Sequence, residues 1–138
     1  MDIYEATQAL LTEAAPEANV TYYLLTYDEQ TDQFTLPEMP AVTYLYTNMT
    51  PIVTHDGNCG LFKVLLDIEV WGPLDTVSCD VSAILNTINA QRVTVENVIF
   101  TIVSQEVRDI YDIGLDFHHR FIRFSGIVEV GEELDDSK

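Results

Sequence analysis

The chain has 138 residues, a length that fits one domain with a hydrophobic core of its own. It carries 23 Asp and Glu residues against 6 Lys and Arg residues, a formal net charge of -17 at pH 7. Proteins that bind nucleic acid tightly neutralise phosphates with Lys and Arg, so this balance argues against such a surface. No apolar run reaches the roughly 18 residues that cross a bilayer, and the acidic first residues are unlike a signal peptide. We expect a chain that stays where it is made, without a membrane contact.

A first amphipathic helix is predicted between Asp2 and Pro16. Asp2 and Glu5 have the spacing of a capping box, which satisfies backbone N–H groups at a helix start. The apolar residues that follow recur every three or four positions: Ile3, Ala6, Leu10, Leu11 and Ala14. Pro16 lacks a backbone donor, so we expect the helix to end before it.

Strands are predicted over the next part of the chain. Residues 20–27 are rich in β-branched and aromatic side chains, the polar run 28–33 indicates a turn, and residues 34–36 indicate the return. Residues 41–48 alternate between two faces and predict another strand.

The clearest strand, residues 61–71, is followed by a helix that can cover it. Its apolar side chains occupy every second position: Phe62, Val64, Leu66, Ile68 and Val70. Asp75 then provides a helix cap, and one stripe of the predicted helix is apolar: Val77, Val81, Ile84, Leu85 and Ile88. Burying five such side chains contributes on the order of 10 kcal/mol before entropy is subtracted, so packing on the sheet holds this helix.

Two further strands, residues 98–106 and 117–130, complete the predicted sheet. The connector between them, residues 108–116, mixes aromatic and charged residues without a period, which favours a displayed loop. The element order predicts an α+β fold: a mostly antiparallel sheet of about four to five strands with two helices packed on one face. We expect residues 1–130 to form one domain and residues 131–138 to form a flexible acidic tail.

The chain lacks a recognisable catalytic or metal-binding motif. His118 and His119 are adjacent on a predicted strand, so they point to opposite faces and cannot share one metal ion. His55 and Asp56 precede Gly57, and a turn alone explains an Asp-Gly pair. The serines have no histidine nearby in sequence, and the connector aspartates lack calcium-loop spacing. We therefore expect no enzyme activity, no cofactor and no metal.

Two glycine-marked segments flank the strands and the helix described above. The first is Thr54-His55-Asp56-Gly57-Asn58-Cys59-Gly60-Leu61, which leads into a strand ending in Val70-Trp71-Gly72. The second is Arg108-Asp109-Ile110-Tyr111-Asp112 with Gly114-Leu115, before a strand that opens with Phe117-His118-His119-Arg120. Together these segments resemble the tail terminator, or tail-completion, proteins of long-tailed bacteriophages. The resemblance covers roughly residues 40–130, and the first helix is consistent with it.

The resemblance implies a structural virion protein rather than an enzyme. Such proteins form a ring, usually a hexamer, that caps the tail tube, ends its polymerisation and helps join tail to head. The implied partners are further copies of this chain, the tail tube protein and the head connector or neck proteins. The implied location is the tail and neck region of the virion, after assembly in the host cytoplasm. Genomic DNA would pass through without specific binding, and an acidic lumen would repel its phosphates over about 8 Å.

The resemblance also suggests which residues lie at contacts between subunits, or at the surface that faces tube or connector. The candidate interface residues are Asp56, Gly57, Asn58, Arg108, Asp109, Tyr111, Asp112, Arg120 and Arg123. Because cations are scarce in so acidic a chain, we expect the arginines to pair with acids. The partner acids belong either to the neighbouring subunit or to the same subunit.

Other functions fit the same sequence. A head-closure, neck or minor tail protein would use a similar ring. A monomeric acidic module would hold a basic protein without assembling. A small hydrolase would need converging carboxylates or histidines, which strand geometry denies to the adjacent histidine pair.

Overall fold

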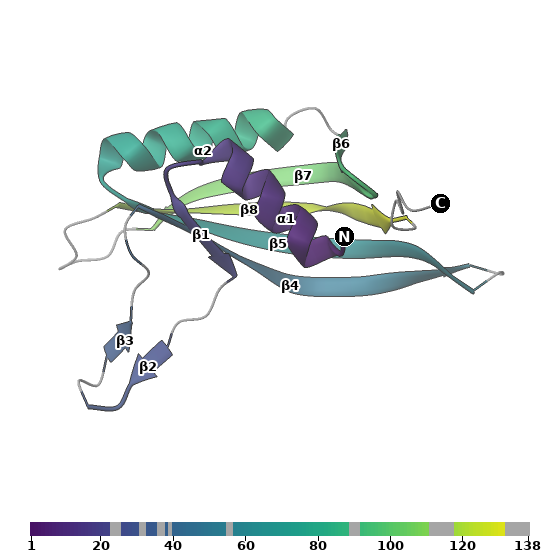
Figure 1. Ribbon diagram of the computed structural model, residues 1–138, viewed down its shortest axis with the longest axis horizontal. Coiled ribbons are helices and arrows are strands. Elements are labelled where there is room, and N and C mark those ends of the chain that lie inside the picture. Colours follow the sequence, from purple (N-terminus) through teal and green to yellow (C-terminus); the bar gives the residue numbers. More distant parts are fainter. Residues whose placement is uncertain are drawn as a thin grey trace, which may run out of the picture.

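Figure 1 shows the computed structural model, in which two helices lie over one face of a long, six-stranded sheet. The structure describes residues 1–22, 26–30, 33–35, 38, 40–54, 57–88, 92–110 and 118–131. The helices are α1 (Ile3–Ala14) and α2 (Leu74–Ile88). The strands are β1 (Asn19–Tyr22), β2 (Thr26–Asp28), β3 (Gln33–Thr35), β4 (Ala41–Thr54), β5 (Gly57–Gly72), β6 (Arg92–Val95), β7 (Val98–Ile110) and β8 (His118–Val130).

The strand order in the large sheet is β1-β4-β5-β8-β7-β6, and β2 pairs with β3 in a separate two-stranded sheet. The α+β class is as predicted. The sheet is larger than the predicted four to five strands and is mixed, because β1 runs parallel to β4 while the other neighbours are antiparallel. The β2–β3 hairpin lies between β1 and β4 in the chain. Because β4 runs parallel to β1, this connection brings the chain back to the end of the sheet at which β1 begins.

The predicted start of α1 is confirmed. The Asp2 carboxylate accepts a hydrogen bond from the Glu5 backbone N–H at 2.8 Å. The helix ends at Ala14, where the Ala15 N–H bonds the Leu11 carbonyl at 2.9 Å. The local signals were sufficient here because capping and apolar spacing agree.

The hydrophobic core lies between the two helices and the sheet face that they cover. The even-numbered apolar residues of β5 supply the sheet side, as predicted, together with those of β8. Those buried there are Val64, Leu66, Ile68, Val70, Ile122, Phe124 and Val128. The α2 stripe supplies the helix side, with Val77, Val81, Ile84 and Ile88 buried and Leu85 partly buried against them. The apolar face that alternation creates on the strands therefore packs against the apolar stripe that the 3.6-residue period creates on the helix.

Several expectations about strand boundaries were wrong. β4 continues to Thr54 instead of ending at residue 48, and β5 begins at Gly57 instead of residue 61, because the two strands pair over this length. The predicted strand 20–27 is divided between β1 and β2, because two different sheets pair with its ends. The strand β6 was missed, since four residues offer too little alternation to detect. The predicted connector 108–116 begins later, because β7 continues to Ile110 through pairing with β8. Residues 111–117 and the predicted tail 132–138 lie outside the described residues.

Two strands of the sheet extend beyond their short outer neighbours. β1 pairs only with residues 41–44 of β4, and β6 pairs only with residues 98–101 of β7. Among the described strands, none pairs with the outer side of residues 45–54 of β4 or residues 102–110 of β7. We call these segments the β4 edge and the β7 edge. Figure 1 shows β4 and β5 reaching well past α1 as a long hairpin.

Candidate functional site

The sheet surface opposite the helices, here called the open face, collects charged and aromatic side chains from four strands. Strand register places them in rows across β4, β5, β8 and β7. The first row is Leu45, Asp67, Arg123 and Glu106; the second is Thr43, Glu69, Phe121 and Arg108; the third includes Trp71 and His119. A β-bulge between Ile102 and Ser104 shifts the alternation of β7, so Glu106 and Arg108 fall on this face.

Asp67 and Arg123 form the central ion pair of the open face. Arg123 donates from Nε to Asp67 Oδ1 at 2.7 Å and from Nη2 to Asp67 Oδ2 at 3.0 Å. These hydrogen bonds first, and then the charges of Asp67 and Glu106, raise the pKa of the guanidinium. The same guanidinium lies 5.3 Å from the centroid of the Phe121 ring, within the range of a cation–π contact.

A second cluster joins Glu69, His119 and Trp71 on the open face. The His119 and Trp71 rings stack, with centroids 3.6 Å apart and planes 15° from parallel, and Trp71 Nε1 donates to Thr43 Oγ1 at 3.3 Å. His119 Nε2 lies 3.3 Å from Glu69 Oε1, close enough for an ion pair, but the atoms are not aligned for a hydrogen bond. Within the described part of the chain, neither His119 Nε2 nor Glu69 Oε2 has a hydrogen-bond partner.

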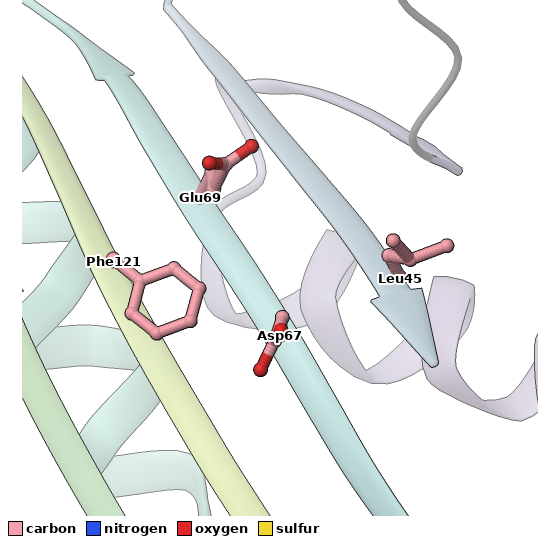
Figure 2. Close-up of a pocket in the computed structure, with 4 residues that line it drawn as sticks. All are labelled: Leu45, Asp67, Glu69 and Phe121. Atoms are coloured by element: carbon pink, nitrogen blue, oxygen red, sulfur yellow. The ribbon is translucent and has the colours of Figure 1, made fainter. Parts of the chain in front are cut away.

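A hollow of about 190 Å³ opens between these two clusters. Figure 2 shows its four described lining residues: Leu45 from β4, Asp67 and Glu69 from β5, and Phe121 from β8. Leu45 and Phe121 form apolar walls, and the other two residues bring carboxylates to the same space. Carboxylates beside an aromatic ring suit a cation, since both interact favourably with positive charge.

The structure separates the candidate interface residues into two regions. Gly57 and Asn58 open β5, paired with Thr54 and Val53 at one end of the sheet. At the opposite end of β5, the arginines lie around Phe121, whose pairing partner on β7 is Arg108. Three candidates, Asp56, Tyr111 and Asp112, lie outside the described residues.

The arginines among the candidates occupy different surroundings. Arg108 Nε lies 2.6 Å from Glu106 Oε1, and both side chains are exposed. Arg123 is bound to Asp67, as described above. Arg120 pairs in register with Val70 and Asp109 and alternates to the other side of β8 from Phe121. For Arg108 and Arg123, the structure therefore contains acid partners within the same chain.

The hollow on the open face was not predicted from the sequence. Alternation with the apolar residues of their strand puts Asp67 and Glu69 on its polar side, but alternation alone indicates no partner for them. The available signal was two acids at positions i and i+2 of one strand, together with Phe121 and Arg123 at the same spacing on another. Register then decides that the two pairs are neighbours.

A scan against protein-family models and a search of curated proteins found no match to this chain. In the part that the structure describes, no group of three or more His, Cys, Asp or Glu residues is placed to hold a metal ion. A helix both long and apolar enough to span a membrane does not occur among the same residues.

Proposed function

We propose that the protein is a structural virion component that caps a phage tail tube as a ring. In this role it ends tube polymerisation and forms part of the head-to-tail joint. The starting point is the resemblance of residues 40–130 to tail terminators. The observation that carries it is a pair of strand edges, on opposite sides of one sheet, that no described strand covers.

A closed ring of identical subunits requires a heterologous contact, in which one patch meets a different patch of the next copy. The β4 edge and the β7 edge are such a pair, because each exposes backbone donors and acceptors for strand addition. Natural edges usually carry protective charges. The whole of β4 carries no charged residue. The β7 edge does carry charges, among them Glu106 and Arg108, but it also displays Val103 and Val107, which are 71% and 42% exposed.

The charge of the chain bears on this role in two ways. A net charge of -17 opposes self-association, so the directional hydrogen bonds between strand edges would have to overcome that repulsion. Excess carboxylates near a channel would repel the phosphates of passing DNA over about 8 Å. Coordinates of the assembled ring that place the acids on the exterior and leave the inner wall neutral or basic would contradict this part of the proposal.

The direct test is electron microscopy of the protein alone and mixed with purified tail tubes. We expect rings, or a distinct cap at one tube end, and tubes that no longer elongate. Tubes that elongate unchanged, with no density added at either end, would overturn the proposal. Binding to emptied heads instead of tubes would favour the head-closure or neck role.

A monomeric acidic binding module is the second candidate, and the hollow on the open face favours it. Mass in solution distinguishes it from a ring protein when tail tubes are also present. A monomer of constant mass at physiological and molar salt, with no tube binding but capture of a basic protein, would favour the module.

A further inference from the structure

We propose that the hollow on the open face binds the guanidinium group of an arginine side chain from a protein partner. This inference rests on the geometry around Glu69 and Phe121 and does not depend on ring formation. It assigns a binding site and a ligand chemistry to the described surface.

The protein already contains one guanidinium held in this manner. Arg123 places its guanidinium against Asp67 through two hydrogen bonds and lies 5.3 Å from the Phe121 centroid. A planar guanidinium suits this setting because it can bond a carboxylate at two points while its face meets an aromatic ring. Phe121 thus contributes to one arginine site on its Asp67 side.

Glu69 is a second carboxylate on the same strand as Asp67, and it lies beside the same phenylalanine. It is the direct cross-strand partner of Phe121, as Asp67 is of Arg123. Its side chain is only 19% exposed, and among the described residues its Oε2 has no hydrogen-bond partner. A carboxylate in such surroundings is costly unless donors reach it. Glu69 already lines the hollow, and rotation about its last side-chain bond, which is a soft torsion, can present either carboxylate oxygen to a donor there.

His119 lies beside Glu69. The imidazole is 9% exposed, stacks on Trp71, and lies 3.3 Å from Glu69 Oε1. Its Nε2 makes no hydrogen bond within the described part of the chain. The carboxylate therefore lies beside a ring held by stacking, but no hydrogen bond ties it to that ring, so it can turn to receive a donor from the hollow.

Size and charge select the ligand. The volume, about 190 Å³, is below the roughly 300 Å³ at which pockets for whole small molecules begin, so the end of one side chain is the appropriate occupant. Phosphate groups are disfavoured by Glu69, whose charge is not paired with an arginine as that of Asp67 is, and by the net charge of -17. Arginine is preferred to lysine because Phe121 offers a face for stacking, which a compact ammonium group uses less well.

The test uses a capped arginine, N-acetyl-arginine-N-methylamide, as the probe. The capped citrulline of the same shape, which lacks the charge, is the control ligand. Trp71 is the single tryptophan of the chain and stacks on His119 beside Glu69, so its fluorescence reports on the site. We expect a saturable change with the arginine compound, at constant ionic strength, and none with the citrulline compound.

Two matched variants identify the site. Glu69→Gln should weaken binding about tenfold, because it removes a charge-assisted contact. Glu129→Gln removes the same charge from an exposed position on β8 outside the hollow and should leave binding unchanged. Equal weakening by both variants would show general attraction to an acidic surface and would overturn the proposal, as would equal binding of citrulline or no saturable change.

A third variant keeps the test informative if Glu69→Gln disturbs the stacked rings. Leu45→Arg introduces a guanidinium at the wall of the hollow, and we expect it to block the probe while leaving circular dichroism and thermal unfolding close to those of the parent protein. Probe binding that persists in a folded Leu45→Arg protein would place the binding elsewhere and contradict the proposal.

Discussion

Arg123 and Asp67 join β8 to β5 by two hydrogen bonds, and the two side chains differ in exposure, 40% for the arginine and 11% for the aspartate. This asymmetry matters because a buried charge without its partner is more costly than an exposed one. Removing the arginine leaves an uncompensated carboxylate in a mostly enclosed position. Removing the aspartate leaves a guanidinium that water can reach.

The first prediction follows from this asymmetry. Arg123→Met should lower the free energy of unfolding more than Asp67→Asn, since an asparagine oxygen can still accept a hydrogen bond from the arginine. Urea denaturation followed by circular dichroism measures the difference. Arg92→Met, at an exposed position on β6, is the control and should change stability little. An Arg123→Met protein as stable as this control would show that the pair contributes nothing.

Alkaline pH should destabilise the protein through Tyr46 and Tyr44. Burial, above all, raises the pKa of Tyr46, whose hydroxyl lies 2.6 Å from Thr7 Oγ1 on α1; burial and then the charge of Tyr22 raise that of Tyr44. The unfolded chain loses these protons near the ordinary pKa of 10.0. Their contribution to stability is therefore complete below that pH and is lost as pH rises toward the folded-state pKa.

Urea denaturation at several pH values from about 8 to about 11 tests this expectation. Tyr46→Phe should reduce the fall in stability with pH, because the phenylalanine cannot ionise. It should also lower stability at pH 8 by about 1 kcal/mol, through loss of the hydrogen bond with Thr7. If the free energy of unfolding of Tyr46→Phe fell with pH as steeply as that of the parent protein, other groups would be the cause of the lost stability at alkaline pH.

Asp80 on α2 should be less favourable than a neutral residue at neutral pH. Burial, and secondarily the charge of Glu17, raise the pKa of its carboxyl, and within the described residues its Oδ2 lacks a hydrogen-bond partner. The stability that depends on the protonated form of Asp80 is therefore complete below the pKa of this carboxyl in the unfolded chain and is lost as pH rises. Asp80→Asn should raise stability at pH 7, by less than about 1 kcal/mol because water screens the site.

Thermal unfolding near pH 7 and near pH 3 checks the Asp80 prediction, since the gain should vanish where the carboxyl is protonated in both states. Asp75→Asn is the contrasting variant. That acid lies in the first turn of α2 and favours the helix dipole, so its neutralisation should lower stability at pH 7. Equal effects of Asp80→Asn and Asp75→Asn on thermal stability at pH 7 would contradict the raised pKa of Asp80.

Gly126 should not tolerate a side chain. A Cβ at this position would overlap the carbonyl oxygen of Thr101 and approach Ile102 Cα to 3.2 Å, next to the bulge of β7. Gly126→Ala should therefore cost on the order of 3 kcal/mol, because backbone atoms have to move. The adjacent Ser125→Ala is the control, and urea denaturation is the measurement. A loss no larger than that of the control would show that the two strands separate easily.

The β7 edge provides a test of assembly that leaves the fold intact. Val103→Lys places a charge on the uncovered part of β7 and should reduce ring formation or tube capping at a given protein concentration. Thr101→Lys makes the same charge change at an exposed position whose neighbour is Arg92 of β6, so that edge is already covered. Light scattering and microscopy should show a defect for Val103→Lys alone. Equal assembly of both variants would reject the β7 edge as a ring contact.

The sequence by itself determined the elements whose signals are local. The capping residues of α1, the apolar stripe of α2 and the alternation of β5 predicted both helices and the covered sheet face, because side-chain period depends on backbone geometry alone. Short strands such as β1 and β6 carried too few residues for this. Their positions are set by pairing with residues elsewhere in the chain.

Only the tertiary structure decided the open face. Asp67 and Arg123 are 56 residues apart, and Glu69 meets Phe121 only when β5 and β8 pair in one register. The bulge of β7 then turns Glu106 toward the same row. Local periodicity tells which side of a strand a residue occupies. Which residue lies across from it depends on register and bulges, which are selected by the packing of the whole sheet.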